Sequence, residues 1–266
     1  MTFDLGPALL FCPADRPERY SKAADRADAV ILDLEDAVAP DHKTAAREAL
    51  VAHPLDPATT IVRVNAVDTP DFALDLAALA MTDYRIVMLA KAVSADQLSG
   101  YDVIALCETA AGVLAAPGLA AQPQVVALMW GAEDLVASLG GTASRFTDGH
   151  YRAVALHARS TVLLAAGANG KAAIDAVHLD IADAPGLAAE ARDAVASGFA
   201  ATACIHPDQV ATIRDAYAPS EHQLENARAV LAAAESEGGA FAFRGVMVDA
   251  PVLDLARRVL ARGGER

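Results

Sequence analysis

The sequence predicts an α/β protein that folds as a TIM (β/α)8 barrel with a C-terminal helical extension. Three observations support this fold. Eight short apolar segments alternate with longer amphipathic ones, the chain has 266 residues, and hydrophobic residues make up 54% of it while aromatic ones make up only 5%. Barrels of this kind commonly have roughly 250 residues in one unit. Cores of Ala, Val, Leu and Ile suit helices packed on buried parallel strands.

The eight apolar segments are rich in Val, Ile and Leu and mostly uninterrupted, as strands buried on both faces should be. In chain order, strands are expected over 8–13, 29–35, 60–65, 85–91, 102–108, 125–131, 173–179 and 201–206. Helical patterns lie between them, for example over 40–52, 70–81, 149–167 and 185–197. A doubly wound open sheet is the alternative fold. No Gly-x-Gly-x-x-Gly motif follows the first segment, which weakens that alternative.

The segment after the eighth expected strand is longer than one barrel needs. A helix is expected over 207–217, and a second one begins after the Ser cap in APSEHQLENARAVLAAAESEGG and ends at a Gly pair. An irregular or strand-like piece and a last helix follow. We therefore expect a barrel over residues 1–217 and an extension over 218–266.

Composition excludes several classes of protein. The net charge of −14 and the lack of clustered Lys and Arg argue against nucleic-acid binding. The N-terminus has no basic region of a signal peptide, and no apolar run approaches the ~18 residues of a membrane span. Cys12, Cys107 and Cys204 lie in apolar segments without metal-ligand spacing, which fits buried thiols and a cytoplasmic location.

In TIM barrels the active site lies at the C-terminal ends of the strands. Polar residues gather at five of these expected ends: Asp33, Glu35 and Asp36; Arg63 and Asn65; Lys91; Glu108; Glu133 and Asp134. By the two-residue alternation of a strand, Arg63 and Asn65 share one face. An inward-facing Arg is costly unless it is paired or binds an anion. So many charged residues at one end of the barrel favour a functional site over a set of salt bridges that only neutralise one another.

Glu108 and Asp134, on neighbouring strand ends, are candidate ligands of one divalent cation. Two carboxylates without a nearby His or Cys favour Mg²⁺ over zinc. His206, at the end of the eighth strand, is expected to be a hydrogen-bonded structural residue. Lys91 suggests Schiff-base chemistry, but the acids near it should keep its amine protonated, which opposes that role.

Seven motifs in order make the chain resemble the citrate lyase beta-subunit-like branch of the HpcH/HpaI aldolase/citrate lyase family. They are LLFCPADRPERYSKA, DAVILDLEDAV, IVRVNA, ETAAGV, WGAEDL, CIHPDQV and GVMVDAP, and together they cover nearly the whole chain. One departure is MLAKA, where relatives usually have Pro before the lysine, and it leaves the local shape of the fourth strand open.

The resemblance implies a Mg²⁺-dependent lyase of 3-hydroxyacyl-CoA thioesters such as citryl-CoA, citramalyl-CoA or malyl-CoA. It assigns Glu108 and Asp134 to the metal, and Arg63 to the carboxylate of the keto acid. The backbone of GAED, with Ala132 and Glu133, is assigned to the same carboxylate.

The resemblance also implies roles outside the strand ends. Arg16 and Lys22 match the basic pair that binds the CoA phosphates. Asp249 matches a catalytic acid delivered to the site of a neighbouring subunit, in a homotrimer or a hexamer made of trimers, so the extension is expected to act as a lid on that subunit. Glu35 is counted with Asp249 and Arg63 as a candidate catalytic residue.

Other functions stay open at this point. The same site could run a malate-synthase-like condensation or a thioester hydrolysis, or serve as the beta subunit of a citrate lyase complex. A pyruvate aldolase of free acids would leave Arg16 and Lys22 without their CoA partner. A barrel that only binds CoA esters would not need an intact pair of Glu108 and Asp134.

Overall fold

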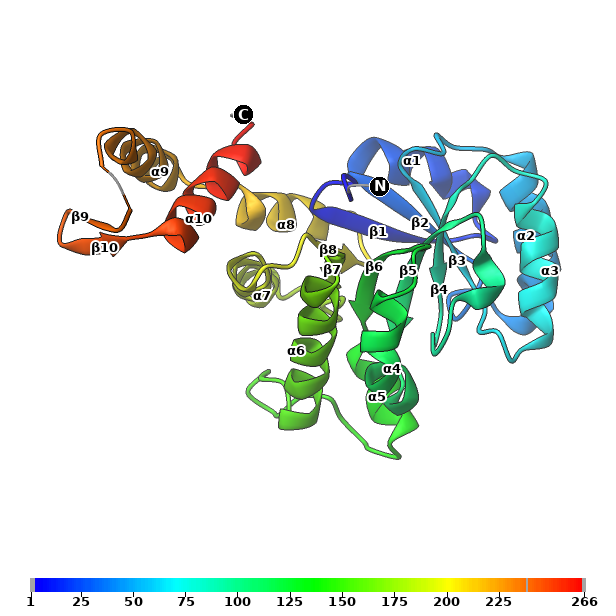
Figure 1. Ribbon diagram of the computed structural model, residues 1–266. Coiled ribbons are helices and arrows are strands. Elements are labelled where there is room, and N and C mark those ends of the chain that lie inside the picture. Colours follow the sequence, from blue (N-terminus) through cyan, green and yellow to red (C-terminus); the bar gives the residue numbers. More distant parts are fainter. Residues whose placement is uncertain (1–2, 238, 265–266) are drawn as a thin grey trace. The chain divides into compact units, whose positions relative to one another are not determined.

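Eight parallel strands close into a barrel, each paired with its neighbours in the chain, and β1 also pairs with β8 (Figure 1). The computed structural model describes residues 3–237 and 239–264. The strands are β1 Ala8–Pro13, β2 Ala29–Asp33, β3 Thr60–Val64, β4 Ile86–Leu89, β5 Asp102–Cys107, β6 Val125–Trp130, β7 Ala172–Asp175 and β8 Ala201–Cys204. The predicted barrel is confirmed.

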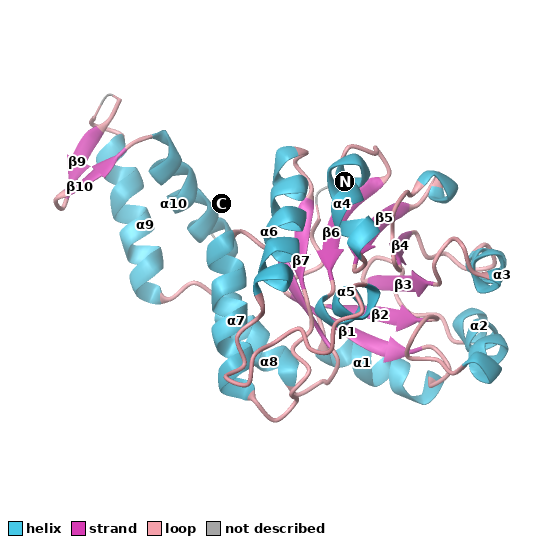
Figure 2. Cartoon of the chain, turned by 90° about the horizontal axis from the view of Figure 1, so that it is seen from below, coloured by secondary structure: helices cyan, strands magenta, loops and turns pink. Residues whose placement is uncertain are grey.

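Helices connect the strands, and α2, α3, α4 and α6 lie outside the ring of strands in Figure 2. The bounds are α1 Tyr20–Arg26, α2 Lys43–Ala52, α3 Pro70–Leu79, α4 Ala110–Ala120, α5 Ala132–Ser138, α6 Ala153–Ala168, α7 Ala184–Ser197 and α8 Gln209–Tyr217. Short 3-10 turns are η1 Pro17–Arg19, η2 Pro40–His42 and η3 Asp96–Leu98. Of the helical ranges expected from the sequence, 149–167 differs most, because residues 149–152 belong to a loop and α6 begins at Ala153.

Several strands end earlier than the sequence predicts, because the residues that follow them turn away from the sheet. β2 ends at Asp33, whose carboxylate accepts hydrogen bonds from the backbone N–H groups of Glu35 (2.9 Å) and Ala37 (3.2 Å). β4 ends at Leu89, and Lys91 has a φ of 51°, in the left-handed region. These turns bring polar side chains over the end of the barrel.

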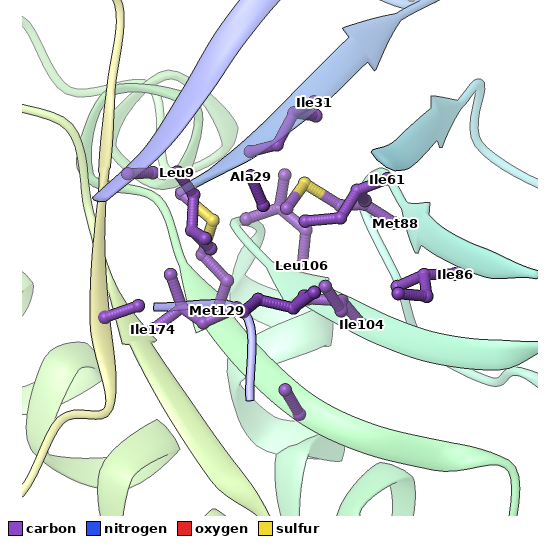
Figure 3. Close-up of a cluster of buried hydrophobic side chains, with 14 residues drawn as sticks. Leu9, Ala29, Ile31, Ile61, Ile86, Met88, Ile104, Leu106, Met129 and Ile174 are labelled. Atoms are coloured by element: carbon purple, nitrogen blue, oxygen red, sulfur yellow. The ribbon is translucent and has the colours of Figure 1, made fainter. Parts of the chain in front are cut away.

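The barrel interior is filled by aliphatic side chains and methionines (Figure 3). Ile31, Ile61 and Leu106 belong to this buried cluster. Two residues further along the same chain segments, on the same face by alternation, come Asp33, Arg63 and Glu108. A charged layer therefore follows the apolar core at the C-terminal end of the strands.

The chain divides by its internal contacts into two units, Met1–Ile213 and Arg214–Arg266. The second contains α9 Glu221–Ala234, the hairpin of β9 Phe241–Phe243 and β10 Val246–Val248, and α10 Ala250–Arg262. Ser220 and Gln223 form the capping box that starts α9, so the Ser cap predicted from the sequence is confirmed. Buried residues Ala227, Val230, Val248, Ala256 and Val259 give this unit a small core of its own.

Within residues 3–237 and 239–264, none of the helices combines the length and the apolar character that crossing a membrane requires.

Candidate active site

Arg63 is held by two carboxylates at the centre of the charged layer. Its Nε and Nη2 donate to the two oxygens of Asp33 at 2.7 and 2.6 Å, and its Nη1 lies 3.2 Å from Glu35 Oε2. The guanidinium also stacks 4.8 Å from the ring centre of Phe11. Burial tends to lower the pKa of Arg63, but the charge of Asp33 outweighs it and raises that pKa. Arg63 is therefore a permanent, oriented cation, and Asp33 supplies the anion that its inward position requires.

The Lys91 side chain contacts acidic residues that follow two strands, β2 and β6. Its Nζ donates to Glu35 and, at 3.1 Å, to Asp36, and it lies 3.4 Å from Asp134 Oδ1. Partial burial acts to lower the pKa of Lys91, but the hydrogen bond and charge of Glu35 and the charges of Glu108 and Asp134 raise it. Lys91 is an ammonium ion, which argues against a Schiff-base role.

Glu35 is buried between the two cations, and burial raises its pKa while Arg63 and Lys91 act to lower it.

Glu108 is a carboxylate in a low-dielectric position. It is 3% exposed, and its Oε1 accepts a 3.1 Å hydrogen bond from the backbone N–H of Lys91. The left-handed conformation of Lys91, which costs roughly 1–2 kcal/mol in a residue other than glycine, accompanies this contact. Burial raises the pKa of Glu108 to about 8, Arg63 opposes the shift and Asp134 adds to it. A cation next to Glu108 would stabilise its charged form.

Residues 132–134 form the first turn of α5, directly after β6 and the N-cap Gly131. Ala132 is buried, and Glu133 accepts a 2.6 Å hydrogen bond from the Ser144 hydroxyl. The Asp134 side chain is 36% exposed. Asp134 is thus the more accessible of the two carboxylates expected to bind metal.

A cavity of about 220 Å³ brings these groups together. Asp33, Arg63, Glu108, Glu133 and Asp134 are its charged lining residues. The other lining residues are largely apolar: Phe11, Ala37, Leu106, Met129, Trp130, Gly131, Ala132, Ala176, Val177, Leu179 and Ile205. Among the described residues that line the cavity, Arg63 is the one with a fixed positive charge.

The donors available to a metal suit a hard cation. Described residues include no group of three or more His, Cys, Asp and Glu side chains placed to hold a metal. Glu108 and Asp134 share the cavity and interact electrostatically. Two carboxylates, with the other positions left to water and substrate oxygens, fit the coordination habits of Mg²⁺.

Arg16 and Lys22, also expected from the sequence, do not line the cavity. The Arg16 side chain is 51% exposed, with its Nε 3.8 Å from Asp15 Oδ1, and Lys22 is an exposed residue of α1. Asp249 lies in the second unit and caps α10, accepting a hydrogen bond from the backbone N–H of Val252 at 3.4 Å.

Asn65 and His206 have structural hydrogen bonds. The Asn65 amide donates to Asp75 Oδ2 (2.6 Å) on α3 and accepts from Lys43 (2.8 Å) on α2, so it does not join Arg63 as the alternation predicted. The reason is that β3 ends at Val64, before the alternation reaches Asn65. His206 Nδ1 accepts from the backbone N–H of Asp208 at 3.2 Å, which agrees with the structural role expected of it.

Two features of the site were missed by sequence reasoning. The first is the role of Asp33, which the sequence presents only as one acid among several. Its position two residues after Ile31 places it on the inward face, opposite Arg63 in the strand register.

The second feature is a set of hydrogen bonds to Asp175. The Trp130 indole N–H donates to Asp175 Oδ1 at 2.5 Å, and Arg159 holds the same carboxylate with its Nη2 at 2.8 Å from Oδ2. No sequence signal pairs these residues, because they come from separate elements.

Comparison with known proteins gives consistent matches over nearly the whole chain. Residues 8–102 and 97–207 match the model of the HpcH/HpaI aldolase/citrate lyase family. A citrate lyase subunit beta-like protein of Mycobacterium tuberculosis is 60% identical over 263 residues, covering 98% of this chain and 96% of that protein. The human mitochondrial citramalyl-CoA lyase is 30% identical over 290 residues, covering 95% of this chain and 84% of the relative.

A solved structure agrees with these matches. The crystal structure of the protein CitE from Mycobacterium tuberculosis, in complex with magnesium, acetoacetate and coenzyme A, superposes with a TM-score of 0.94 at 60% identity and covers 98% of each chain.

Proposed function

Because the chain belongs to the HpcH/HpaI aldolase/citrate lyase family, we propose that it is a Mg²⁺-dependent carbon–carbon lyase of 3-hydroxyacyl-CoA thioesters. The reaction breaks the bond between the α and β carbons. The β-hydroxyl loses its proton and becomes the carbonyl of a keto acid, and the α carbon gains a proton to give the acyl-CoA. The reverse reaction is a condensation in the same site.

The observation that carries this proposal is the pair of Glu108 and Asp134 in one cavity with Arg63. Glu108 is almost fully buried and its pKa is raised to about 8, so its charged form needs a cation beside it. When bound, Mg²⁺ supplies a Lewis acid for the hydroxyl oxygen that becomes a carbonyl oxygen. The CitE structure from Mycobacterium tuberculosis, which contains magnesium, acetoacetate and coenzyme A, supports this assignment.

Arg63 is proposed to bind the carboxylate of the keto acid. Asp33 occupies its Nε and one N–H of Nη2, and Glu35 lies 3.2 Å from Nη1, which fixes the plane of the guanidinium and leaves one N–H on each terminal nitrogen for a ligand. The backbone N–H groups of Ala132 and Glu133, which lie in the first turn of α5, are proposed to donate to the same carboxylate. The chain would thus orient the substrate before the bond breaks.

The remaining roles extend beyond the cavity. Arg16 and Lys22, near the start of α1, are proposed to bind the CoA phosphates. Asp249 is proposed to exchange the proton at the α carbon in the site of a neighbouring copy, within a homotrimer or a hexamer of trimers. Glu35 lies between Arg63 and Lys91 and is proposed to hold both cations in place beside the substrate.

The charged and apolar residues of the cavity favour one thioester substrate over the others. Arg63 is its one fixed cation among the described lining residues, so a product with a second carboxylate, as from citryl-CoA, would find no further partner. Met129, Val177 and Ile205 offer an apolar wall instead. A methyl group on the reacting carbon would gain about 0.8 kcal/mol by burial there. We therefore propose citramalyl-CoA as the preferred thioester, followed by malyl-CoA and then citryl-CoA.

The test is a panel of these three thioesters with Mg²⁺, with acetyl-CoA, keto acid and free CoA measured separately. We expect keto acid and acetyl-CoA in equal amounts, and a kcat/KM for citramalyl-CoA roughly fourfold above that for malyl-CoA, the ratio to which about 0.8 kcal/mol corresponds. Glu108→Gln serves as the inactive control. Release of free CoA with an intact hydroxy acid would replace the lyase by a thioesterase. Borohydride trapping of substrate on Lys91 would contradict the metal mechanism.

A further inference from the structure

Gly131 separates the two carboxylates proposed to bind the metal. It follows the last residue of β6 and is the N-cap of α5, which carries Asp134 in its first turn. It also faces the end of β5, because a Cβ placed on Gly131 would lie 2.9 Å from Glu108 Cβ and 3.0 Å from Glu108 Oε2. The backbone of the α5 N-terminus and the Glu108 side chain therefore pack with no space for a methyl group between them.

The requirement for glycine here comes from space and not from backbone conformation. Gly131 has φ −132° and ψ 131°, an extended conformation that any residue adopts. The closest obstacle is the Cβ of Glu108, which is fixed to the strand and cannot rotate away. Any larger residue at 131 must displace the end of β5, the start of α5, or both.

A larger residue at position 131 would affect the Glu108 side chain in particular. Its carboxylate is held by one backbone N–H, that of Lys91, at 3.1 Å. A Cβ added at Gly131 would lie 3.0 Å from the other oxygen of Glu108, Oε2. The methyl group of an alanine would therefore push against the oxygen that does not accept the hydrogen bond from Lys91. Metal ligands tolerate little displacement, since coordination fixes both distance and direction.

We propose that Gly131 is a positioning residue of the metal site, which reserves the volume occupied by the Glu108 carboxylate and lets it converge with Asp134 on one cation. This inference rests on the proposed function only in taking Glu108 and Asp134 as the ligands. Gly131 lines the cavity, but it is proposed here neither as a metal ligand nor as one of the two N–H donors to the carboxylate. It acts through the place of the Glu108 side chain.

The experiment measures Mn²⁺ binding to the full chain by electron paramagnetic resonance, with no substrate present, for wild type and Gly131→Ala. We expect the Kd for Mn²⁺ to rise roughly tenfold or more in the variant, the range seen when groups that position metal ligands are changed. The matched control is Gly118→Ala, because a Cβ at Gly118, on α4, meets no atom within 4 Å. Its Kd should equal that of wild type.

A second measurement separates positioning from a general loss of structure. In the lyase assay, the Mg²⁺ concentration for half-maximal rate should rise in Gly131→Ala, while the rate at saturating Mg²⁺ recovers much of its wild-type value. Wild-type affinity for Mn²⁺ in a folded Gly131→Ala protein would overturn the inference. Wild-type protein that binds no Mn²⁺ would instead overturn the proposed metal site.

If Gly131→Ala does not fold, a double variant tests whether its defect comes from the contact with Glu108. The double variant Gly131→Ala/Glu108→Gly removes the Cβ that collides with the new methyl group and should regain the melting temperature of Glu108→Gly alone. Failure of the double variant to regain it would show that the constraint on Gly131 does not act through Glu108, and the inference would be wrong.

Discussion

At the scale of single residues, the site depends on charges that compensate one another inside the barrel. Asp33 and Arg63 face each other in the register of β2 and β3 and form two hydrogen bonds under the apolar ring of Phe11. Removing one partner of a buried ion pair leaves the other charge without compensation, which costs more than the pair itself contributes.

Asp33→Asn tests this arrangement. We expect a loss of about 3–5 kcal/mol in the free energy of unfolding, the range for a broken buried pair, and a higher KM for the thioester because Arg63 loses its orientation. Asp36→Asn is the control, since the Asp36 side chain is 59% exposed and such a pair contributes at most about 1 kcal/mol. Urea titration and steady-state kinetics measure both effects. Equal stability losses in the two variants would contradict the account.

Glu108 makes the stability of the metal-free protein depend on pH. Its pKa rises from 4.5 to about 8 on folding because the group is buried. The folded state therefore keeps a proton that the unfolded chain has already released, and the contribution of Glu108 to stability falls as pH rises through this window. Glu108→Gln has no proton to lose, so its stability relative to wild type should increase from about pH 4.5 to about pH 8 in chelator.

Excess Mg²⁺ should reverse that order at high pH, because the metal binds and stabilises only the folded wild type. Urea titrations of both proteins over this pH range, with chelator and with Mg²⁺, measure the difference. A stability difference that is flat with pH in chelator would show that Glu108 is not held in an unfavourable environment.

The sequence indicated which residues carry charge at the site but not how they pair. The positions of Asp33, Arg63 and Glu108 at the ends of apolar segments placed them at the correct end of the barrel. The partners come from register between strands, as for Asp33 and Arg63, or from turns, as for Lys91 with its φ of 51°. Neither register nor turn geometry is encoded in a single segment.

At the scale of elements, the sequence predicted strands better than helices. The buried strands are continuous apolar runs, so all eight were located from the sequence, although several end earlier than predicted. α4, AAGVLAAPGLA, is apolar all round and shows no helical period, and α5 has only seven residues. Both helices follow strands that end in site residues, so the elements that shape the site were the ones that periodicity could not reveal.

The start of α1 carries a prediction of its own. Arg16 and Lys22 are exposed, and replacing both with Ala should leave the free energy of unfolding within about 0.5 kcal/mol of wild type. We expect a higher KM for the CoA ester and a shallower dependence of that KM on salt, because fewer phosphate contacts remain. Kinetics at several NaCl concentrations measure this. An unchanged KM with altered stability would mean that the pair is only a solvated surface.

At the scale of the whole molecule, the barrel could be predicted from the alternation of eight strands with helices. The second unit does not follow from that alternation. The Ser cap predicted the start of α9 correctly, but the helix ends at Ala234, before the Gly pair that was expected to end it, of which Gly238 lies outside the described residues. Where Asp249 acts depends on how copies of the chain assemble, and a single sequence does not contain that information. The shared site therefore stays a proposal.

Complementation between inactive variants tests the shared site. Asp249→Asn keeps the cap of α10, since Asn caps as well as Asp, but lacks the carboxylate, and Glu108→Gln lacks a metal ligand. In oligomers mixed in equal parts, roughly one quarter of the sites should combine an intact Glu108 with a neighbour's intact Asp249 and recover activity. A mixture of Glu108→Gln with Asp134→Asn is the control, because both defects lie in one chain's site. Verified mixed oligomers without recovery would rule the shared site out.

The most direct test of the central claim is the initial rate of citramalyl-CoA cleavage as a function of free Mg²⁺. Wild type should form no pyruvate in excess chelator and regain its full rate as Mg²⁺ is added back. Glu108→Gln should stay inactive at a Mg²⁺ concentration that saturates wild type, with its fold verified by circular dichroism. Undiminished cleavage by wild type in excess chelator, or by Glu108→Gln, would contradict a metal-dependent lyase at this site.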